Sequence, residues 1–202
     1  MRDARISPPA RAKAPSTMSL GREIIETVVL TAVIFLAVHL SVQPFRVDGP
    51  SMQPGLHTND LVIVNLLTYD FASPQRGDII VFHPPTESDP SKYYVKRIIG
   101  IPGDTITITP TAVFVDGQKL SEPYIYPLPS GVSENPVVLP KVVLGAGEYF
   151  VMGDNRLDSQ DSRFFGPITR GSIVGKAEAV VWPANAITWL KNYTAVFAAV
   201  HQ

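Results

Sequence analysis

Residues 24–42 form a largely apolar run close to the N-terminus, built mostly of Val, Ile, Leu, Ala and Phe. The run has 19 residues, about the length that an α-helix needs to cross the hydrocarbon core of a bilayer. Glu26 and His39 lie near its two ends, where polar side chains can reach the interface. We therefore predict a transmembrane helix over residues 23–42. A buried core helix and a cleaved signal peptide are the alternatives, but the run is long for a signal peptide and no small-x-small cleavage site follows it.

The charges before this run predict its orientation. Residues 1–22 carry four Arg and one Lys against a single Asp, and they are rich in Pro and Ser. The positive-inside rule places this segment in the cytoplasm, where its composition predicts a disordered tail. Residues 43–202 then lie outside. The predicted location is the plasma membrane in a single pass, and a mitochondrial inner membrane or a thylakoid stays open as an alternative.

Residues 43–202 amount to one domain, for which the sequence predicts a mainly β fold. Short apolar runs alternate with turns rich in Gly, Pro and Asp, and 19 prolines argue against long soluble helices. We expect coiled antiparallel sheets in a barrel-like catalytic domain, with an exposed loop over 121–141. Strands are expected at 61–64, 79–82, 93–100, 105–109, 113–115, 149–152 and 173–182.

The composition excludes several classes of function. The chain has no cysteine, which excludes thiol catalysis, iron–sulfur clusters and cysteine zinc sites. Its net charge of −1 offers no basic footprint for nucleic acid. The four histidines are scattered without metal-ligand spacing, so we expect neither a metal nor a cofactor.

Two segments far apart in the sequence carry a serine and a lysine with catalytic potential. Ser51 lies in a tight loop over 49–55, and Lys96 lies in the apolar run 93–100. A lysine among apolar neighbours loses hydration of its ammonium, so its pKa falls. The neutral amine can then take a proton from a serine hydroxyl, and Ser-Lys is a known variant of the serine nucleophile arrangement. The alternative is a strand lysine that points to solvent.

A third segment, residues 153–166, is dense in groups that can cross-link a loop: three Asp, two Arg, two Ser and one Asn. Such a segment can hold its own backbone in place without an apolar core. A calcium-binding loop is an alternative, but the spacing of the carboxylates differs from that of the usual calcium motif. A solvated surface loop is another alternative.

Taken together, these segments resemble type I signal peptidase, a membrane-anchored Ser-Lys protease family. The resemblance extends from residue 24 to about residue 182. It rests on four motifs in the family's order: S-M-Q-P-G-L at 51–56, R-G-D-I-I-V-F at 76–82, Y-V-K-R-I-I-G-I-P-G-D at 94–104 and G-D-N-R-L-D-S-Q-D-S-R-F-F-G at 153–166. It implies an endopeptidase that removes signal peptides from exported preproteins at the outer face of a membrane.

The resemblance also implies roles for individual residues. Ser51 falls at the position of the nucleophile and Lys96 at that of the general base. Ser159 falls where a hydroxyl orients the lysine, and Asp161 and Arg163 fall where an ion pair supports the site.

Further positions concern the substrate and the oxyanion. Segments that line small pockets, and would favour an Ala-x-Ala-like end, include Phe45, Val47, Tyr94 and Val95. Gly49 stands where some members carry a serine that donates to the oxyanion, so the Ser51 amide is the expected donor here. Gly55 replaces the family's usual threonine, for which we expect a changed turn.

The expected partners are signal-peptide-bearing preproteins and the lipid bilayer. Val42 and Ser51 are nine positions apart, a span of at most about 30 Å when fully extended, so the nucleophile is expected near the membrane face. Two rival functions remain. One is a membrane-tethered binding domain without enzymatic activity, and the other is a LexA-like Ser-Lys protein that cleaves itself.

Overall fold

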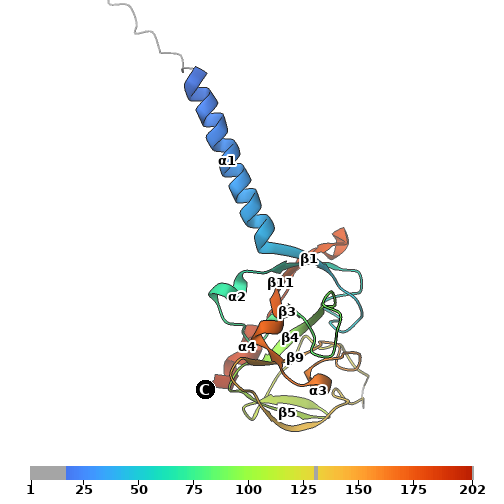
Figure 1. Ribbon diagram of the computed structural model, residues 1–202. Helices are drawn as coiled ribbons and strands as arrows, with labels where there is room; N and C mark the ends of the chain where they lie inside the picture. The colour runs from blue at the N-terminus through green and yellow to red at the C-terminus, as the bar shows by residue number, and fades with distance from the viewer. Residues whose placement is uncertain (1–16, 130–131, 202) are drawn as a thin grey trace, which may run out of the picture. The chain divides into compact units, whose positions relative to one another are not determined.

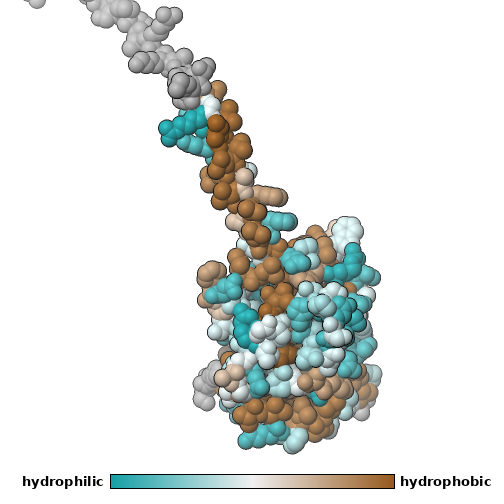
Figure 2. Space-filling model, in the orientation of Figure 1, coloured by the Kyte–Doolittle hydropathy of each residue, from teal (hydrophilic) through white to brown (hydrophobic). Residues whose placement is uncertain are grey.

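A computed structural model describes residues 17–129 and 132–201 (Figure 1). The chain divides between His39 and Leu40 into two compact units. The long helix α1 (Thr17–Ser41) accounts for the described part of the first, and its segment Leu20–Ser41 is long and apolar enough to span a bilayer. From residue 20 to residue 40 every position is exposed, and apolar residues cover most of the face of α1 in Figure 2. A helix that is apolar all round and unburied is suited to lipid.

The helix differs at both ends from the predicted 23–42. It begins at Thr17, within the segment for which we expected a tail, and Val42 already starts strand β1. Residues 1–16, which make up most of that predicted tail, lie outside the described residues. The division into tail, membrane span and outer domain stays a prediction.

The second unit is mainly β, as predicted, and holds two antiparallel sheets. The larger has eight strands in the order β1-β2-β11-β3-β4-β9-β10, with β12 paired to β11. Their bounds are β1 Val42–Arg46, β2 Leu61–Asn65, β3 Ile79–Phe82, β4 Tyr94–Gly100, β9 Glu148–Met152, β10 Ile168–Thr169, β11 Ile173–Trp182 and β12 Thr188–Trp189. Register shifts interrupt the pairing of β11 with β2 and β3 and of β4 with β9. Such irregularities bend strands, which explains the predicted coiling of the sheet.

The smaller sheet has the order β7-β6-β5-β8. Its bounds are β5 Thr105–Thr109, β6 Ala112–Val115, β7 Gln118–Lys119 and β8 Leu139–Val143. A turn at Asp116-Gly117 closes the hairpin of β6 and β7, and both residues have positive φ, as a type I′ hairpin turn requires. The apolar residues of β5 alternate into the core, with Ile106 and Ile108 fully buried.

Short helices fill the connections: α2 Thr68–Phe71, α3 Ser162–Phe165, α4 Thr194–Phe197, and the 3₁₀ turns η1 Arg170–Ser172, η2 Ala184–Ala186 and η3 Ala198–His201. The segment 121–141, expected as an exposed loop, is partly buried: Tyr124 and Asn135 are 3% and 2% exposed, and β8 begins at Leu139. The expectation holds for most of the described part of this segment, which is exposed, and fails at these two residues and at β8. Pro and Ser content indicates turns, but it does not show which residues between the turns anchor the segment, as Asn135 does through its hydrogen bond to the Thr109 carbonyl.

Candidate active site

Ser51 lies in the loop that connects β1 to β2. Two backbone hydrogen bonds close the base of this loop, from Val47 N to Asp60 O and from Asn59 N to Val47 O, both at 2.9 Å. Met52 is buried directly after the serine, so the loop is anchored on both sides of its tip. Gly49 has a φ of +87°, a left-handed conformation that favours glycine, and this turn leads the chain into Ser51.

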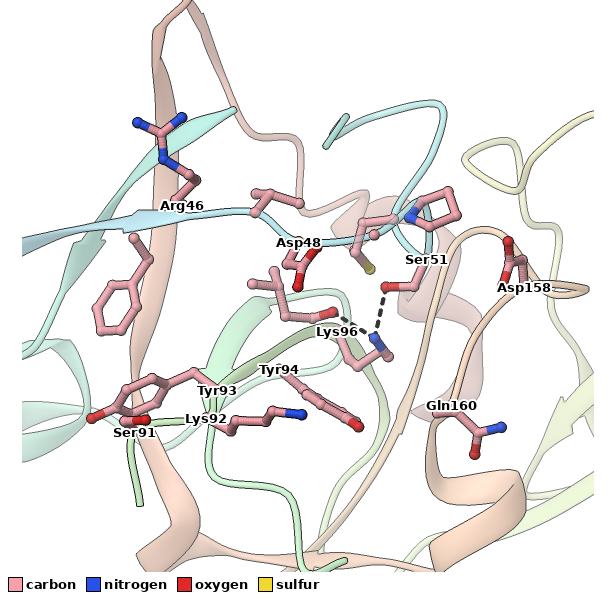
Figure 3. A pocket seen from close by; sticks show the side chains of 16 residues that line it. Arg46, Asp48, Ser51, Ser91, Lys92, Tyr93, Tyr94, Lys96, Asp158 and Gln160 are labelled. Carbon is pink, nitrogen blue, oxygen red and sulfur yellow. Dashed lines mark hydrogen bonds between the residues drawn. The ribbon is translucent and has the colours of Figure 1, made fainter. Parts of the chain in front are cut away.

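Strand β4 places Lys96 against this loop. The lysine is 4% exposed, and its Nζ donates hydrogen bonds to Ser51 Oγ at 2.7 Å and to the Val95 carbonyl at 3.1 Å (Figure 3). The structure therefore brings together the two residues that the sequence singled out, 45 positions apart.

Burial lowers the pKa of Lys96 from 10.5 to about 8, because the ammonium loses its hydration. The carboxylates of Asp161 and Asp154 oppose this shift, and the charge of Arg163 adds to it. An amine with such a pKa, within hydrogen-bond distance of a hydroxyl, can act as a general base near neutral pH.

The segment after β9 packs a fully buried carboxylate beside this pair. Asp161 accepts two hydrogen bonds from the Arg163 guanidinium at 2.8 Å, one from Gly153 N at 3.0 Å and one from Ser159 Oγ at 2.7 Å. Burial alone would raise the pKa of Asp161, but the bonds and charge of Arg163 lower it below its ordinary value. The carboxylate therefore stays ionised.

The Ser159 hydroxyl is thus engaged by Asp161. Within the described part of the chain, no hydrogen bond joins Ser159 to Lys96, whose donors go to Ser51 and Val95. The expected orientation of the lysine by Ser159 stays a prediction. In this structure the influence of Asp161 on Lys96 acts through its charge.

A cavity of about 490 Å³ opens beside Ser51. The four residues expected to contact substrate line it, namely Phe45, Val47, Tyr94 and Val95. Phe45 also packs edge-on against Tyr93, with ring centroids 5.1 Å apart. Asp158 and Gln160 reach the cavity from the segment after β9 and leave one border of it polar (Figure 3).

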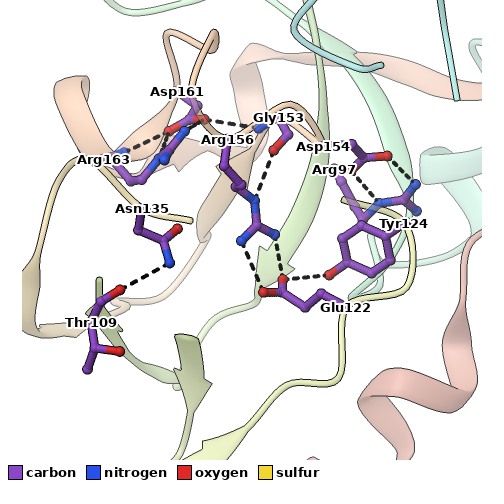
Figure 4. A network of polar contacts seen from close by, with 10 residues as sticks. All are labelled: Arg97, Thr109, Glu122, Tyr124, Asn135, Gly153, Asp154, Arg156, Asp161 and Arg163. Atoms are coloured by element: carbon purple, nitrogen blue, oxygen red, sulfur yellow. Dashed lines mark hydrogen bonds and ion pairs between the residues drawn. The ribbon is translucent and has the colours of Figure 1, made fainter. Parts of the chain in front are cut away.

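Sequence reasoning assigned no role to Asp154, Asn155 or Arg156, although all three lie in the quoted motif at 153–166. Asp154 forms a two-bond ion pair with Arg97 at 2.8 and 2.9 Å, and Arg156 pairs with Glu122 (Figure 4). The backbone amide of Asn155 donates to the Ser51 carbonyl at 3.0 Å. These contacts tie the segment to β4, to the 122–124 region and to the nucleophile loop.

The same contacts bear on the calcium alternative. Arginines engage two of the three carboxylates in 153–166, at Asp154 and Asp161. Across residues 17–129 and 132–201, no cluster of three or more His, Asp or Glu side chains could hold a metal ion. The loop is held by arginine–carboxylate pairs.

Comparisons with known proteins return similar chains from one family. The family model described as signal peptidase, peptidase S26, matches residues 21–182. A signal peptidase I of Leptolyngbya laminosa is 38% identical over 189 residues, covering 90% of each chain. A signal peptidase I of Bacillus caldolyticus is 41% identical over 147 residues, covering 69% of this chain and 79% of its own. A crystal structure of a signal peptidase I from Enterococcus faecalis V583 is 31% identical, with a TM-score of 0.45, and covers 52% of this chain and 97% of that one.

Proposed function

We propose that this chain, which belongs to the signal peptidase family, peptidase S26, cleaves signal peptides from exported preproteins with Ser51 as nucleophile and Lys96 as general base. Family membership makes it a serine-type peptidase of signal peptides. The dyad itself rests on one observation, the distance of 2.7 Å between Ser51 Oγ and the Nζ of a buried lysine.

In the first half of the reaction, the signal-peptide end of the substrate lies in the cavity beside Ser51. Ser51 Oγ attacks the scissile carbonyl carbon, the hydroxyl proton passes to Lys96 Nζ, and the carbonyl electron pair moves to oxygen. The C–N bond then breaks as the Lys96 ammonium returns its proton to the leaving amine. The mature protein departs, and the signal peptide remains as an ester on Ser51.

Water completes the second half by the same route. Lys96 removes a proton from the attacking water, the ester carbonyl passes through a second tetrahedral state, and the proton returns to Ser51 Oγ as the signal peptide leaves. With a pKa of about 8, roughly a tenth of the lysines are neutral at pH 7, compared with well under 1% of ordinary lysines. Burial therefore supplies the base that the reaction needs.

The substrate pockets suit a small, apolar cleavage end. Apolar surfaces of Val47 and Val95 and the rings of Phe45 and Tyr94 line the cavity next to the nucleophile. We propose that they accept an Ala-x-Ala-like sequence in an extended conformation, with the substrate's own apolar segment held in the membrane that α1 crosses.

The test is cleavage of a preprotein by the full chain in detergent, followed by sequencing of the new N-terminus. We expect Ser51→Ala and Lys96→Ala each to abolish cleavage, and the double variant to lose no more, because the two groups act as a unit. Ser91→Ala and Lys92→Ala are matched controls, since both residues line the same cavity and are exposed.

Substantial turnover by either dyad variant would overturn the assignment. Self-cleavage without preprotein cleavage would favour the LexA-like alternative. Full biological activity of Ser51→Ala would favour the tethered binding domain.

A further inference from the structure

The proposed reaction needs a hydrogen-bond donor for the oxyanion, and the nucleophile loop offers few. Gly49 has no side chain to donate, and Pro50 has no N–H. The backbone amide of Ser51 remains, and among the residues that the structure describes nothing accepts a hydrogen bond from it. This free amide lies next to the attacking Oγ, so its direction decides how well the oxyanion is stabilised.

The direction of the Ser51 N–H is set by the peptide unit between Pro50 and Ser51. A peptide unit is planar, so holding its carbonyl oxygen in place also aims the N–H on its other side. The Pro50 carbonyl accepts two hydrogen bonds, from Gln53 N at 3.0 Å and from Asn155 Nδ2 at 3.3 Å. The hydrogen bond from Gln53 belongs to the local turn, whereas Asn155 lies 105 positions further along the sequence.

Asn155 holds the following peptide unit as well. Its backbone N–H donates to the Ser51 carbonyl at 3.0 Å. One residue thus contacts the carbonyls on both sides of the Ser51 Cα, and Asn155 is itself 8% exposed. Donation to a carbonyl oxygen also polarises the amide and makes its N–H a stronger donor.

The residues around Asn155 are fixed by buried groups. Asp154 is paired with Arg97 and Arg156 with Glu122, so the chain is anchored immediately before and after Asn155. A Cβ at Gly153 would overlap Ser159 Oγ and the Ser51 carbonyl oxygen, which shows how closely the two loops approach.

We infer that Asn155 is a positioning residue for the oxyanion donor: its side-chain amide holds the 50–51 peptide so that the Ser51 N–H points at the developing negative charge. This inference rests on the proposed function. Asn155 acts through the peptide: it is not itself among the residues that line the cavity, and its hydrogen bonds go to the carbonyls of Pro50 and Ser51.

The test compares Asn155→Ala and Asn155→Asp with wild type. The aspartate keeps the shape, but as a carboxylate it cannot donate. Loss of an oxyanion donor lowers kcat by about 10²–10³-fold in other enzymes. A donor that is present but points in the wrong direction should therefore lower kcat by about 10- to 100-fold. We expect KM to stay within about twofold and the acidic limb of the pH profile to stay in place, because Lys96 is untouched.

A second readout isolates the oxyanion. The probe is a signal-sequence peptide that ends in an alanine aldehyde. Ser51 Oγ adds to the aldehyde carbon, the carbonyl electron pair moves to oxygen, and the hydroxyl proton passes to Lys96. The inhibition constant of this aldehyde should rise by the same factor as kcat/KM falls. The dissociation constant of the matching peptide ending in alanine amide should not change. Gln118→Ala is the control, because Gln118 carries an exposed amide side chain in β7 and lies outside the cavity.

Full kcat in both Asn155 variants would overturn the inference. So would a change confined to KM, or an equal loss in Gln118→Ala. Weaker amide binding together with a shifted pH limb would also overturn it, because it would mark a structural role. Preprotein cleavage by wild type and by Gln118→Ala tests the proposed function separately, so the two failures are distinguishable.

Discussion

Lys96 is an ionisable side chain in a position that favours its neutral form. Its pKa falls to about 8 because burial removes hydration, and Arg163 adds to that effect while Asp161 and Asp154 oppose it. With a folded pKa below the unfolded value, the unfolded chain binds more protons between about pH 8 and 10.5. The penalty that Lys96 imposes on folding is therefore complete below pH 8 and disappears as the pH rises through that window.

Lys96→Met should therefore stabilise the domain while it abolishes catalysis. We expect the free energy of unfolding to rise by up to about 3 kcal/mol at pH 7, because burial lowers the pKa of Lys96 from 10.5 to about 8, and we expect the gain to shrink toward zero by pH 10.5. Urea unfolding followed by Trp fluorescence at both pH values measures it. The exposed Lys92→Met is the control, and a gain of equal size at both pH values would contradict the shifted pKa.

Some residues of the candidate site could be predicted from the sequence, and others could not. Ser51 and Lys96 could be singled out because each stands in an unusual local pattern, a serine in a tight loop and a lysine in an apolar strand. The contacts of Asn155 could not be derived in this way. They join positions 105 apart and depend on a close approach of two backbones that local pattern does not encode.

The segment after β9 is held by buried ion pairs. Glu122 and Arg156 have side chains 5% and 1% exposed, and the guanidinium donates to both carboxylate oxygens of Glu122. Arg97 stacks over the ring of Tyr124 at 4.4 Å while it bonds Asp154. Two arginines thus link the active-site segment to β4 and to the 122–124 region.

Replacing one partner of such a pair should lower the free energy of unfolding more than replacing both partners. Glu122→Leu leaves the Arg156 charge buried without its partner, so we expect destabilisation of about 3–5 kcal/mol in urea unfolding. Glu122→Leu combined with Arg156→Met should recover most of that loss. Lys92→Ala, which removes an exposed ammonium 3.8 Å from the Glu87 carboxylate, should have little effect. Equal destabilisation by the single and double variants would show that these side chains act by packing rather than charge.

Strands with a clear apolar pattern were predictable, and the others were not. The core strands β2, β3 and β5 lie where runs of Ile and Val predicted them. β1 went unrecognised as a strand because Pro44 interrupts it, and proline is tolerated there since β1 is the edge of its sheet. β10 and β12 contain two residues each, too few to show any periodicity.

Across the whole molecule, an apolar helix precedes a mainly β domain, and basic residues precede the helix. The described helix is apolar over Leu20–Ser41, which supports membrane association. The membrane helix could be predicted from the hydropathy and length of the segment, because a span in lipid must be apolar and must satisfy its own backbone hydrogen bonds. The orientation across the membrane rests on charge bias alone and stays a prediction.

Protease protection tests that orientation. A protease added outside sealed spheroplasts should digest residues 43–202 and leave an N-terminal tag intact, because the positive flank is retained in the cytoplasm. Disruption of the membrane should expose the tag, which provides the control. Protection of the β domain in sealed spheroplasts would reverse the orientation and place the active site on the wrong face for exported preproteins.

The most direct test of the central claim, that buried Lys96 is the base for Ser51, is the pH dependence of kcat/KM. The profile should rise with pH through an apparent pKa near 8, the value for the free enzyme's base. His57→Gln and His83→Gln should leave this limb in place. A limb that vanishes with either histidine, or that lies near the pKa of an ordinary lysine, would contradict the Ser51–Lys96 mechanism.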